Sequence, residues 1–146
     1  MSRWFEDFEV GARFESEYGR TILDADNVWF TMLTLNTNPI HFDYEFASTT
    51  EFGRPLVNSC LTLSLVVGMS VADVSQNGIN LGWSDVRMPA PLFVGDTLHA
   101  ETEVVAVRAS ESRPSMGVVT VVTRGRTQEG TVVIELTRSV LVRRRP

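Results

Sequence analysis

The amino-acid sequence predicts an α+β domain in which a curved antiparallel sheet wraps around one long buried central helix. Residues 58–74 are apolar on nearly every side of a helix, and such a helix belongs inside a domain. The second half of the chain holds long runs rich in valine and threonine, separated by turn residues, which is typical of antiparallel strands. Strands of this length around one hydrophobic helix indicate a sheet folded over that helix.

Length, composition and charge favour one domain over residues 1–146 and exclude several functions. The chain has 146 residues, 43% of them hydrophobic, which is enough for one substantial core. The net charge of -5 argues against a nucleic-acid partner, because phosphates need a basic face. All 13 basic residues are arginine, so a lysine Schiff base is excluded. Two histidines and one cysteine cannot form a four-ligand zinc site in one subunit, and we expect neither metal nor cofactor.

The N-terminal part of the chain predicts a strand followed by a helix. Gly11 turns the chain into a strand over residues 13–21. Asp24 is placed to cap a helix that runs to about Leu35. The apolar face predicted for this helix consists of Val28, Trp29, Met32, Leu33 and Leu35.

Residues 36–57 form an unusually long connection to the central helix. Pro39 disfavours helical geometry at Asn38, so the chain leaves the preceding helix as an irregular segment. The segment contains His41, and long connections of this kind are often functional. We therefore expect an active site here.

The central helix is predicted from Asn58 or Ser59 to Val74. A membrane span is the competing interpretation, but the stretch is short and interrupted by small and polar residues, so burial under a sheet is favoured. The predicted strands cover residues 79–86, 97–108, 117–127 and 131–142, and residues 128–130 form a hairpin between the last two.

Residues 36–41 read Asn-Thr-Asn-Pro-Ile-His, and residues 52–57 and 91–96 carry further proline and glycine motifs before the helix and a strand. Together with the order of elements, they resemble the MaoC-like dehydratase family, which includes (R)-specific enoyl-CoA hydratases and has the signature Asp-x-Asn-Pro-x-His. The motifs Asn36-Thr37-Asn38-Pro39 and Val57-Asn58-Ser59 resemble the sequences of the branch that contains mesaconyl-CoA and itaconyl-CoA hydratases.

The resemblance implies a hotdog fold and the addition of water to an enoyl-CoA thioester, or its removal. It also implies an acyl-CoA substrate, coenzyme A only as part of that substrate, and a homodimer or higher homo-oligomer. No membrane partner is expected. The single cysteine, Cys60, and first residues unlike a signal peptide predict a cytoplasmic location.

Hydration of an enoyl thioester needs a base for the water, a proton for the α carbon and donors for the enolate oxygen. His41 is the natural base, since its ordinary pKa of about 6.5 leaves much of it neutral at pH 7. Asn38 orients the water or the histidine, or it holds the loop. The N–H of Ser59 is the best candidate enolate donor, because main-chain N–H groups at a helix start are unpaired. Asn58 or Ser59 also serves as the helix cap.

Asn36 stands where hydratases of this family carry an aspartate that shares proton transfer with the histidine. A carboxamide can orient a water molecule, but it cannot relay the proton. Three outcomes stay open: His41 performs both transfers, a nearby aspartate supplies the second acid, or hydration is lost and the protein binds acyl thioesters. The aspartates considered are Asp24, Asp26 and Asp43.

Arg54 and Arg87 are candidates for binding the phosphates of coenzyme A or a substrate carboxylate, and a plain surface position explains them equally well. The remaining interpretations are a solvent-facing side chain for His99, turn chemistry for Asp96, and core packing for Cys60, Trp29 and Trp83.

The sequence therefore predicts a hydratase or dehydratase acting on a short or branched enoyl-CoA thioester, with mesaconyl-CoA and itaconyl-CoA among the candidates. His41 is the predicted base and Asn36 the predicted water-orienting amide. The alternatives are a hotdog acyl-CoA thioesterase, and a catalytically weak acyl-CoA binding protein or subunit that completes a partner's site.

Overall fold

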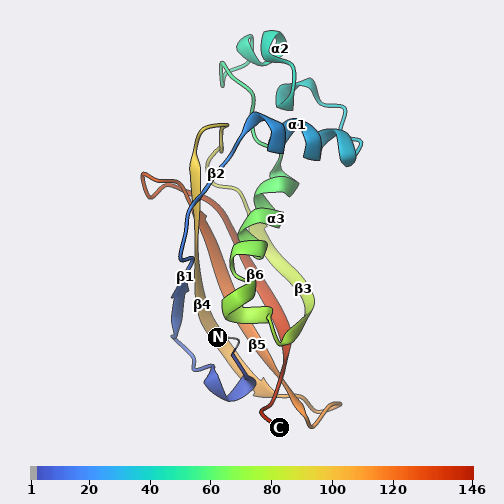
Figure 1. Ribbon diagram of the computed structural model, residues 1–146, viewed down its shortest axis with the longest axis vertical. Coiled ribbons are helices and arrows are strands. Elements are labelled where there is room, and N and C mark those ends of the chain that lie inside the picture. Colours follow the sequence, from blue (N-terminus) through green and yellow to red (C-terminus); the bar gives the residue numbers. More distant parts are fainter. Residues whose placement is uncertain (1–2) are drawn as a thin grey trace.

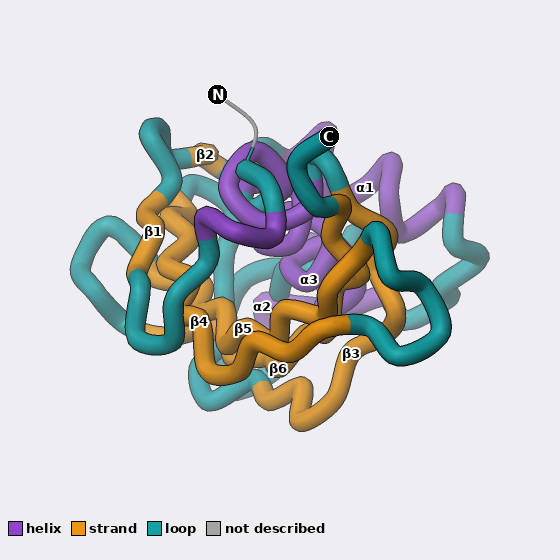
Figure 2. The backbone as a smooth tube through the Cα atoms, turned by 90° about the horizontal axis from the view of Figure 1, so that it is seen from below, coloured by secondary structure: helices purple, strands orange, loops and turns teal. Residues whose placement is uncertain are grey.

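The computed structural model describes residues 3–146 as an antiparallel sheet with helices on one side (Figures 1 and 2). The strands are β1 (Arg13–Glu15), β2 (Arg20–Thr21), β3 (Gly78–Arg87), β4 (Thr97–Ala109), β5 (Met116–Arg126) and β6 (Val132–Arg143). Their order in the sheet is β1-β4-β5-β6-β3, and β2 also pairs with β4. The predicted α+β class with a sheet over a central helix is confirmed.

In the three central strands, β4, β5 and β6, buried and less buried side chains alternate along the chain. Along most of β5 every second residue is buried, because successive side chains of a strand point to opposite faces. Val121 of β5 lies opposite Val104 of β4 and Arg138 of β6. The four predicted long strands agree with β3, β4, β5 and β6 to within one residue at each end.

The predicted strand over residues 13–21 is wrong, because a bend divides it into β1 and β2. At the bend, Ser16 donates its N–H to the carbonyl of Ala100 at 2.8 Å and accepts the Ala100 N–H on its hydroxyl at 3.0 Å. Gly19 lies so close to the His99 ring that a Cβ would come within 2.6 Å of it. Glycine therefore lets the bent segment cross β4 closely.

The central helix α3 (Ser59–Met69) packs on the sheet through the main hydrophobic cluster, in which Leu61 and Val66 meet Leu98, Ile134 and Leu136. In Figure 1 it lies in front of the strands and runs along them. Val57 and Leu61, on either side of the start of α3, both belong to this cluster, so the packing also fixes the start of α3, which follows the segment that contains His41.

α3 is shorter and less enclosed than the sequence predicts. It ends at Met69, and a π-helical turn, η3 (Val71–Ser75), follows. The Ser70 hydroxyl donates to the Val67 carbonyl at 2.8 Å, which competes with continued α-helical hydrogen bonding. Cys60 is exposed, so its predicted core position is wrong. Within residues 3–146 no helix is long and apolar enough to cross a membrane.

Helix α1 (Asp24–Leu33) confirms the predicted helix, but its orientation differs. The predicted cap is wrong: Asp26 accepts the Leu23 N–H at 2.9 Å, whereas Asp24 accepts the hydroxyl of Tyr44. The predicted apolar face points largely outward, and Trp29 is 69% exposed. The buried residues of α1 are polar, namely Asn27 and Thr31.

The connection over residues 36–57 is more regular than predicted. It contains η2 (Pro39–His41), a 3-10 turn, and α2 (Tyr44–Ser48). Asn38 caps η2 by accepting the Ile40 N–H at 3.2 Å, and Asp43 caps α2 by accepting the Phe46 N–H at 2.9 Å. Another 3-10 turn, η1 (Phe5–Asp7), lies near the N-terminus. These caps give the segment its shape without extensive core packing.

Candidate active site

His41 ends η2 and is buried, with 7% of its surface exposed. Its Nδ1 lies 2.8 Å from the main-chain oxygen of Leu56. A carbonyl oxygen can only accept, so Nδ1 carries the proton and the neutral ring keeps a lone pair on Nε2. This is the form in which an imidazole acts as a general base through Nε2.

A buried asparagine of α1 joins the His41 segment to the start of α3. Asn27, 1% exposed, donates through Nδ2 to the carbonyl of His41 at 2.8 Å and to that of Leu56 at 3.1 Å. Its Oδ1 accepts the Asn58 N–H at 2.8 Å. The Leu56 carbonyl thus receives two donors, one from Asn27 and one from the His41 ring.

The start of α3 is capped by Asn58, which is 3% exposed. Asn58 Oδ1 accepts the Cys60 N–H at 3.0 Å, and its Nδ2 donates to the Thr31 hydroxyl at 3.2 Å. The cap leaves the Ser59 N–H without a hydrogen-bond acceptor among residues 3–146. A free N–H at a helix start suits a developing negative charge.

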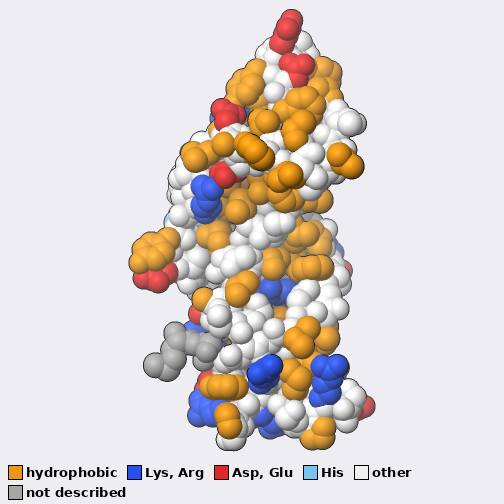
Figure 3. Space-filling model, turned by 45° about the vertical axis from the view of Figure 1, so that its right-hand side comes forward, with side chains coloured by type: hydrophobic (Ala, Val, Ile, Leu, Met, Phe, Trp, Pro, Cys, Tyr) orange, Lys and Arg blue, Asp and Glu red, His pale blue; other side chains and the backbone are white. Residues whose placement is uncertain are grey.

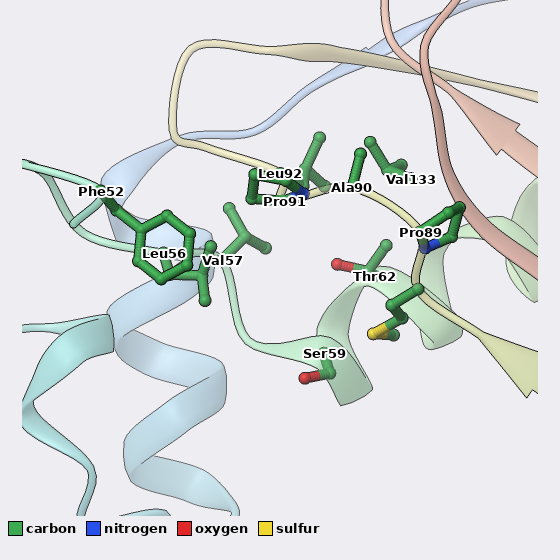
Figure 4. Close-up of a pocket in the computed structure, with 11 residues that line it drawn as sticks. Phe52, Leu56, Val57, Ser59, Thr62, Pro89, Ala90, Pro91, Leu92 and Val133 are labelled. Carbon is green, nitrogen blue, oxygen red and sulfur yellow. The ribbon is translucent and has the colours of Figure 1, made fainter.

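A pocket of about 290 Å³ opens beside this helix start (Figure 4). Ser59 and Thr62 line it from α3, Phe52 and Leu56 from the connecting segment, and residues 88–92 from the chain after β3. The lining is largely apolar and carries no charged side chain, so it suits a short uncharged acyl group. His41 is not part of this lining, but Leu56 lines the pocket and holds the His41 ring.

The structure does not bring Asn36 or Asn38 into hydrogen-bonding contact with the His41 ring within the described part of the chain. Asn36 Oδ1 accepts the Asn38 N–H at 3.0 Å, so both asparagines use their oxygens to shape the loop. Asn36 also lines a second pocket of about 270 Å³ with Phe42 and residues from the end of α1. The preceding Leu35 has a φ of 55°, a left-handed conformation that costs leucine energy.

Arg54 is exposed, and its guanidinium carbon lies 3.8 Å from the centroid of the Phe93 ring. Phe93 in turn meets Phe52, which lines the pocket, with ring centroids 6.1 Å apart. Arg54 therefore lies at the rim of the pocket, next to Phe93 and Phe52, and stays the candidate for binding a phosphate of coenzyme A. Arg87 is also exposed.

The three aspartates considered as replacement acids are engaged elsewhere. Asp24 accepts from Tyr44, Asp26 forms an ion pair with Arg20 at 2.7 Å, and Asp43 caps α2. The hydrogen bond to Asp24 raises the pKa of the Tyr44 hydroxyl.

Of the remaining sequence predictions, those for His99 and Asp96 are confirmed and those for the two tryptophans are wrong. His99 is exposed, as predicted, and Asp96 accepts the Phe93 N–H at 2.9 Å in a turn, as predicted. Trp83 is 50% exposed, so core packing is wrong for it in this chain, as it is for Trp29. Both tryptophans are on surfaces formed by β3 and α1 that no other part of the described chain covers.

The geometry agrees with comparisons to known proteins. The family model described as “MaoC like domain” matches residues 7–126. The chain belongs to the MaoC-like domain family. This MaoC-like domain is 33% identical over 144 residues to mesaconyl-CoA hydratase of Cereibacter sphaeroides, covering 98% of the chain and 42% of that protein. It is 37% identical over 132 residues to (R)-specific enoyl-CoA hydratase of Aeromonas caviae, covering 88% of the chain and 91% of that protein.

Solved structures place the MaoC-like domain in the hotdog fold. The MaoC-like dehydratase of Rhodospirillum rubrum has a TM-score of 0.88 at 32% identity, with 99% of each chain covered. A Mycobacterium tuberculosis protein with a double hotdog fold has a TM-score of 0.90 at 23% identity, covering 99% of this chain and 45% of that one. The predicted hotdog fold is confirmed. The MaoC-like domain spans about two fifths of the mesaconyl-CoA hydratase that it matches.

Sequence reasoning missed Asn27 and Thr31, which the structure buries beside His41 and Asn58. A signal was present, because positions 27, 31 and 34 place polar side chains on one helix face at i, i+4 and i+7. The sequence analysis instead predicted that the wider apolar face of the same helix is buried.

Proposed function

We propose that this MaoC-like domain is an acyl-CoA hydratase or dehydratase that acts on a short or branched enoyl-CoA thioester. The observation that carries the proposal is the hydrogen bond between His41 Nδ1 and the Leu56 carbonyl, which leaves Nε2 as a base. The names of the relatives, mesaconyl-CoA hydratase and (R)-specific enoyl-CoA hydratase, support the same reaction class.

In the hydration direction, His41 Nε2 removes a proton from water while the water oxygen forms a bond to the β carbon. The electrons of the C=C bond move toward the thioester oxygen, and the Ser59 N–H stabilises the resulting enolate. The His41 imidazolium then returns its proton to the α carbon, which regenerates the neutral base. Because Asn36 Oδ1 accepts the Asn38 N–H, Asn36 would orient the water through its Nδ2, and Asn38 holds the loop. No cofactor is required besides the coenzyme A portion of the substrate.

The acyl specificity follows from the pocket beside α3. Its apolar lining and volume of about 290 Å³ support a short or branched acyl group. Mesaconyl-type and itaconyl-type substrates add a carboxylate, which requires a cation that the lining lacks. Crotonyl-CoA is therefore the first substrate to test, and the carboxylate-bearing thioesters come next.

We also propose a homodimer, or a higher homo-oligomer built from it, through the open edge of β3. This edge strand exposes hydrophobic side chains along its length, namely Ile79, Leu81, Trp83 and Val86. Figure 3 shows a separate group of hydrophobic side chains over the upper part of the molecule, where Figure 1 places α1 and α2. A cytoplasmic location is proposed as well, supported by the single cysteine of the sequence.

The test is hydration of crotonyl-, mesaconyl- and itaconyl-CoA, followed as loss of the conjugated thioester absorbance. His41→Ala should lower kcat/KM by about a hundredfold or more while the far-UV circular dichroism stays unchanged. His99→Ala is the matched control, because His99 is exposed and should leave the rate unaltered. Equal turnover by His41→Ala and the unaltered protein would remove the proposal.

A second candidate function is acyl-CoA binding without turnover, which the engagement of Asn36 in the loop favours. Calorimetric binding of CoA esters with no absorbance change, or activity only after a companion chain is added, would support it. Release of free thiol from acyl-CoA would instead identify a thioesterase.

A further inference from the structure

Asn27 is the side chain through which three separate segments are fixed relative to one another. It lies on α1, donates to the carbonyls of His41 and Leu56, and accepts the N–H of Asn58. These hydrogen bonds hold the proposed base on one side and the capped start of α3 on the other. All three are at most 3.1 Å long, and Asn27 is 1% exposed, so water does not replace them.

We propose that Asn27 is a positioning residue that keeps the His41 imidazole protonated at Nδ1 and aligned with the amide groups at the start of α3. This inference rests on the proposed role of His41 as the base. Asn27 is not itself part of the pocket lining and forms no hydrogen bond with the His41 ring among residues 3–146, so it acts through the Leu56 carbonyl and the His41 main chain.

The shared Leu56 carbonyl links Asn27 to the orientation of the His41 ring. This carbonyl accepts from Asn27 at 3.1 Å and from His41 Nδ1 at 2.8 Å, so losing the Asn27 donor releases one of the two hydrogen bonds that fix it. An aspartate at position 27 lacks the amide donors and would place its oxygens against the carbonyl oxygens of His41 and Leu56. Asn27→Asp should therefore displace the Leu56 carbonyl and the His41 ring that it holds.

The charged groups on the elements packed around η2 are few. α1 and α2 contact η2 and contribute Asp24, Asp26 and Glu45, and Asp43 precedes α2. Asp24, Asp26 and Asp43 are held by Tyr44, Arg20 and the Phe46 N–H. None of the four carboxylates forms an ion pair with His41 among residues 3–146. In the described part of the chain the His41 ring is therefore held by the Leu56 carbonyl and not by an ion pair.

The experiment identifies the tautomer of His41 by NMR of ring-labelled histidine at alkaline pH. The chain has two histidines, so His99→Gln leaves a single ring signal. The unaltered protein should show the nitrogen shifts of a single Nδ1–H tautomer, and Asn27→Asp should shift them toward the average of two exchanging tautomers. At pH 7 its kcat should fall about tenfold to a hundredfold with KM changed less than about threefold, because misplacement affects the transition state most.

Thr31→Val is the matched control. It removes a buried partner of Asn58 from the same cluster without touching the Leu56 carbonyl, so it should lower the melting temperature and leave the His41 tautomer unchanged. If Asn27→Asp does not fold, Asn27→Ser serves instead. Asn27→Ser removes both donated hydrogen bonds without adding charge, and it should lower kcat by at least about tenfold.

A folded Asn27→Asp whose His41 tautomer and kcat match those of the unaltered protein would overturn the inference, as would a Thr31→Val variant that changes the tautomer equally. Failure of the proposed function is separate. An unaltered protein that hydrates no enoyl-CoA, but whose His41 tautomer responds to Asn27→Asp, would refute hydratase activity and keep Asn27 as the residue that orients the ring.

Discussion

The imidazole of His41 hydrogen bonds to a backbone carbonyl at 2.8 Å, and no carboxylate is paired with it among residues 3–146. A neutral carbonyl fixes the tautomer without adding the negative charge that would favour the imidazolium. Leu56 thereby fixes the tautomer of the ring, and no carboxylate is paired with it in this part of the chain to share a second proton transfer. The sequence identified His41 through its motif, whereas the Leu56 carbonyl lies 15 residues away and is visible only in the fold.

Asn36→Asp tests whether the missing carboxylate limits the rate. Asp retains an oxygen that can accept the Asn38 N–H, so the loop should keep its shape. We expect kcat for crotonyl-CoA hydration to rise by at least about tenfold, because a second acid–base group typically contributes about a hundredfold or more. Asn38→Asp, measured in the same assay, is the control. An unchanged kcat in folded Asn36→Asp would mean that position 36 takes no part in proton transfer.

Arg54→Ala tests whether the rim arginine binds the phosphates of coenzyme A. We expect KM for crotonyl-CoA to rise about tenfold, which corresponds to about 1.4 kcal/mol, with kcat little changed. The N-acetylcysteamine thioester of the same acid lacks the phosphates, so its KM should be unaffected. Equal changes for both thioesters would show that Arg54 acts by packing on Phe93.

At the scale of the element, α1 is a helix whose polar face is inside. Helices usually bury their apolar face, yet here Asn27 and Thr31 are buried and Leu33 is 73% exposed. The hydrogen bonds to His41, Leu56 and Asn58 decide this orientation. Those partners are brought to α1 by tertiary folding, so the helix was predictable from its sequence while its inward face was not.

The C-terminal end of α3 holds a buried cation. Arg138 is 2% exposed, its Nη2 donates to the Ser70 hydroxyl at 3.0 Å, and burial lowers its pKa. The negative end of the helix dipole offsets part of the cost of burying this charge. Ser70→Ala should therefore lower the free energy of unfolding by about 1–3 kcal/mol, measured by urea denaturation.

The same change in an Arg138→Met background isolates the interaction. We expect Ser70→Ala to cost less than about 0.5 kcal/mol there, because no guanidinium is left without its partner. A loss of equal size in both backgrounds would show that Ser70 acts through the helix end alone.

For the whole molecule, the open edge of β3 is the feature on which the proposal of a second copy of the chain rests. Leu81 is 55% exposed on this strand, and a charge there should oppose pairing of two edges. We expect Leu81→Glu to convert the proposed dimer into a monomer in sedimentation experiments, with a loss of activity if both copies form the site. Val105→Glu, on the exposed surface of β4, is the matched control. A Leu81→Glu protein that sediments as the unaltered one does would exclude this edge as the interface.

The overall architecture was predictable because its signals are local. Alternating valine and threonine residues define the strands, and the apolar run after Asn58 defines α3. The bend between β1 and β2 was not predictable, since it depends on Ser16 binding to Ala100 of a distant strand. In the candidate site, the motif gave the base and the cap, but the hydrogen bonds that join them run through Asn27, which belongs to no motif.

Cys60, the second residue of α3, is exposed and is the single cysteine of the chain. Its neighbour Ser59 lines the pocket, and its own N–H is held by Asn58. A maleimide fluorophore would therefore attach at one defined place, a single residue from the proposed enolate donor. Changes in its emission on addition of a thioester would report occupancy directly, in molecules that turn over and in variants that do not.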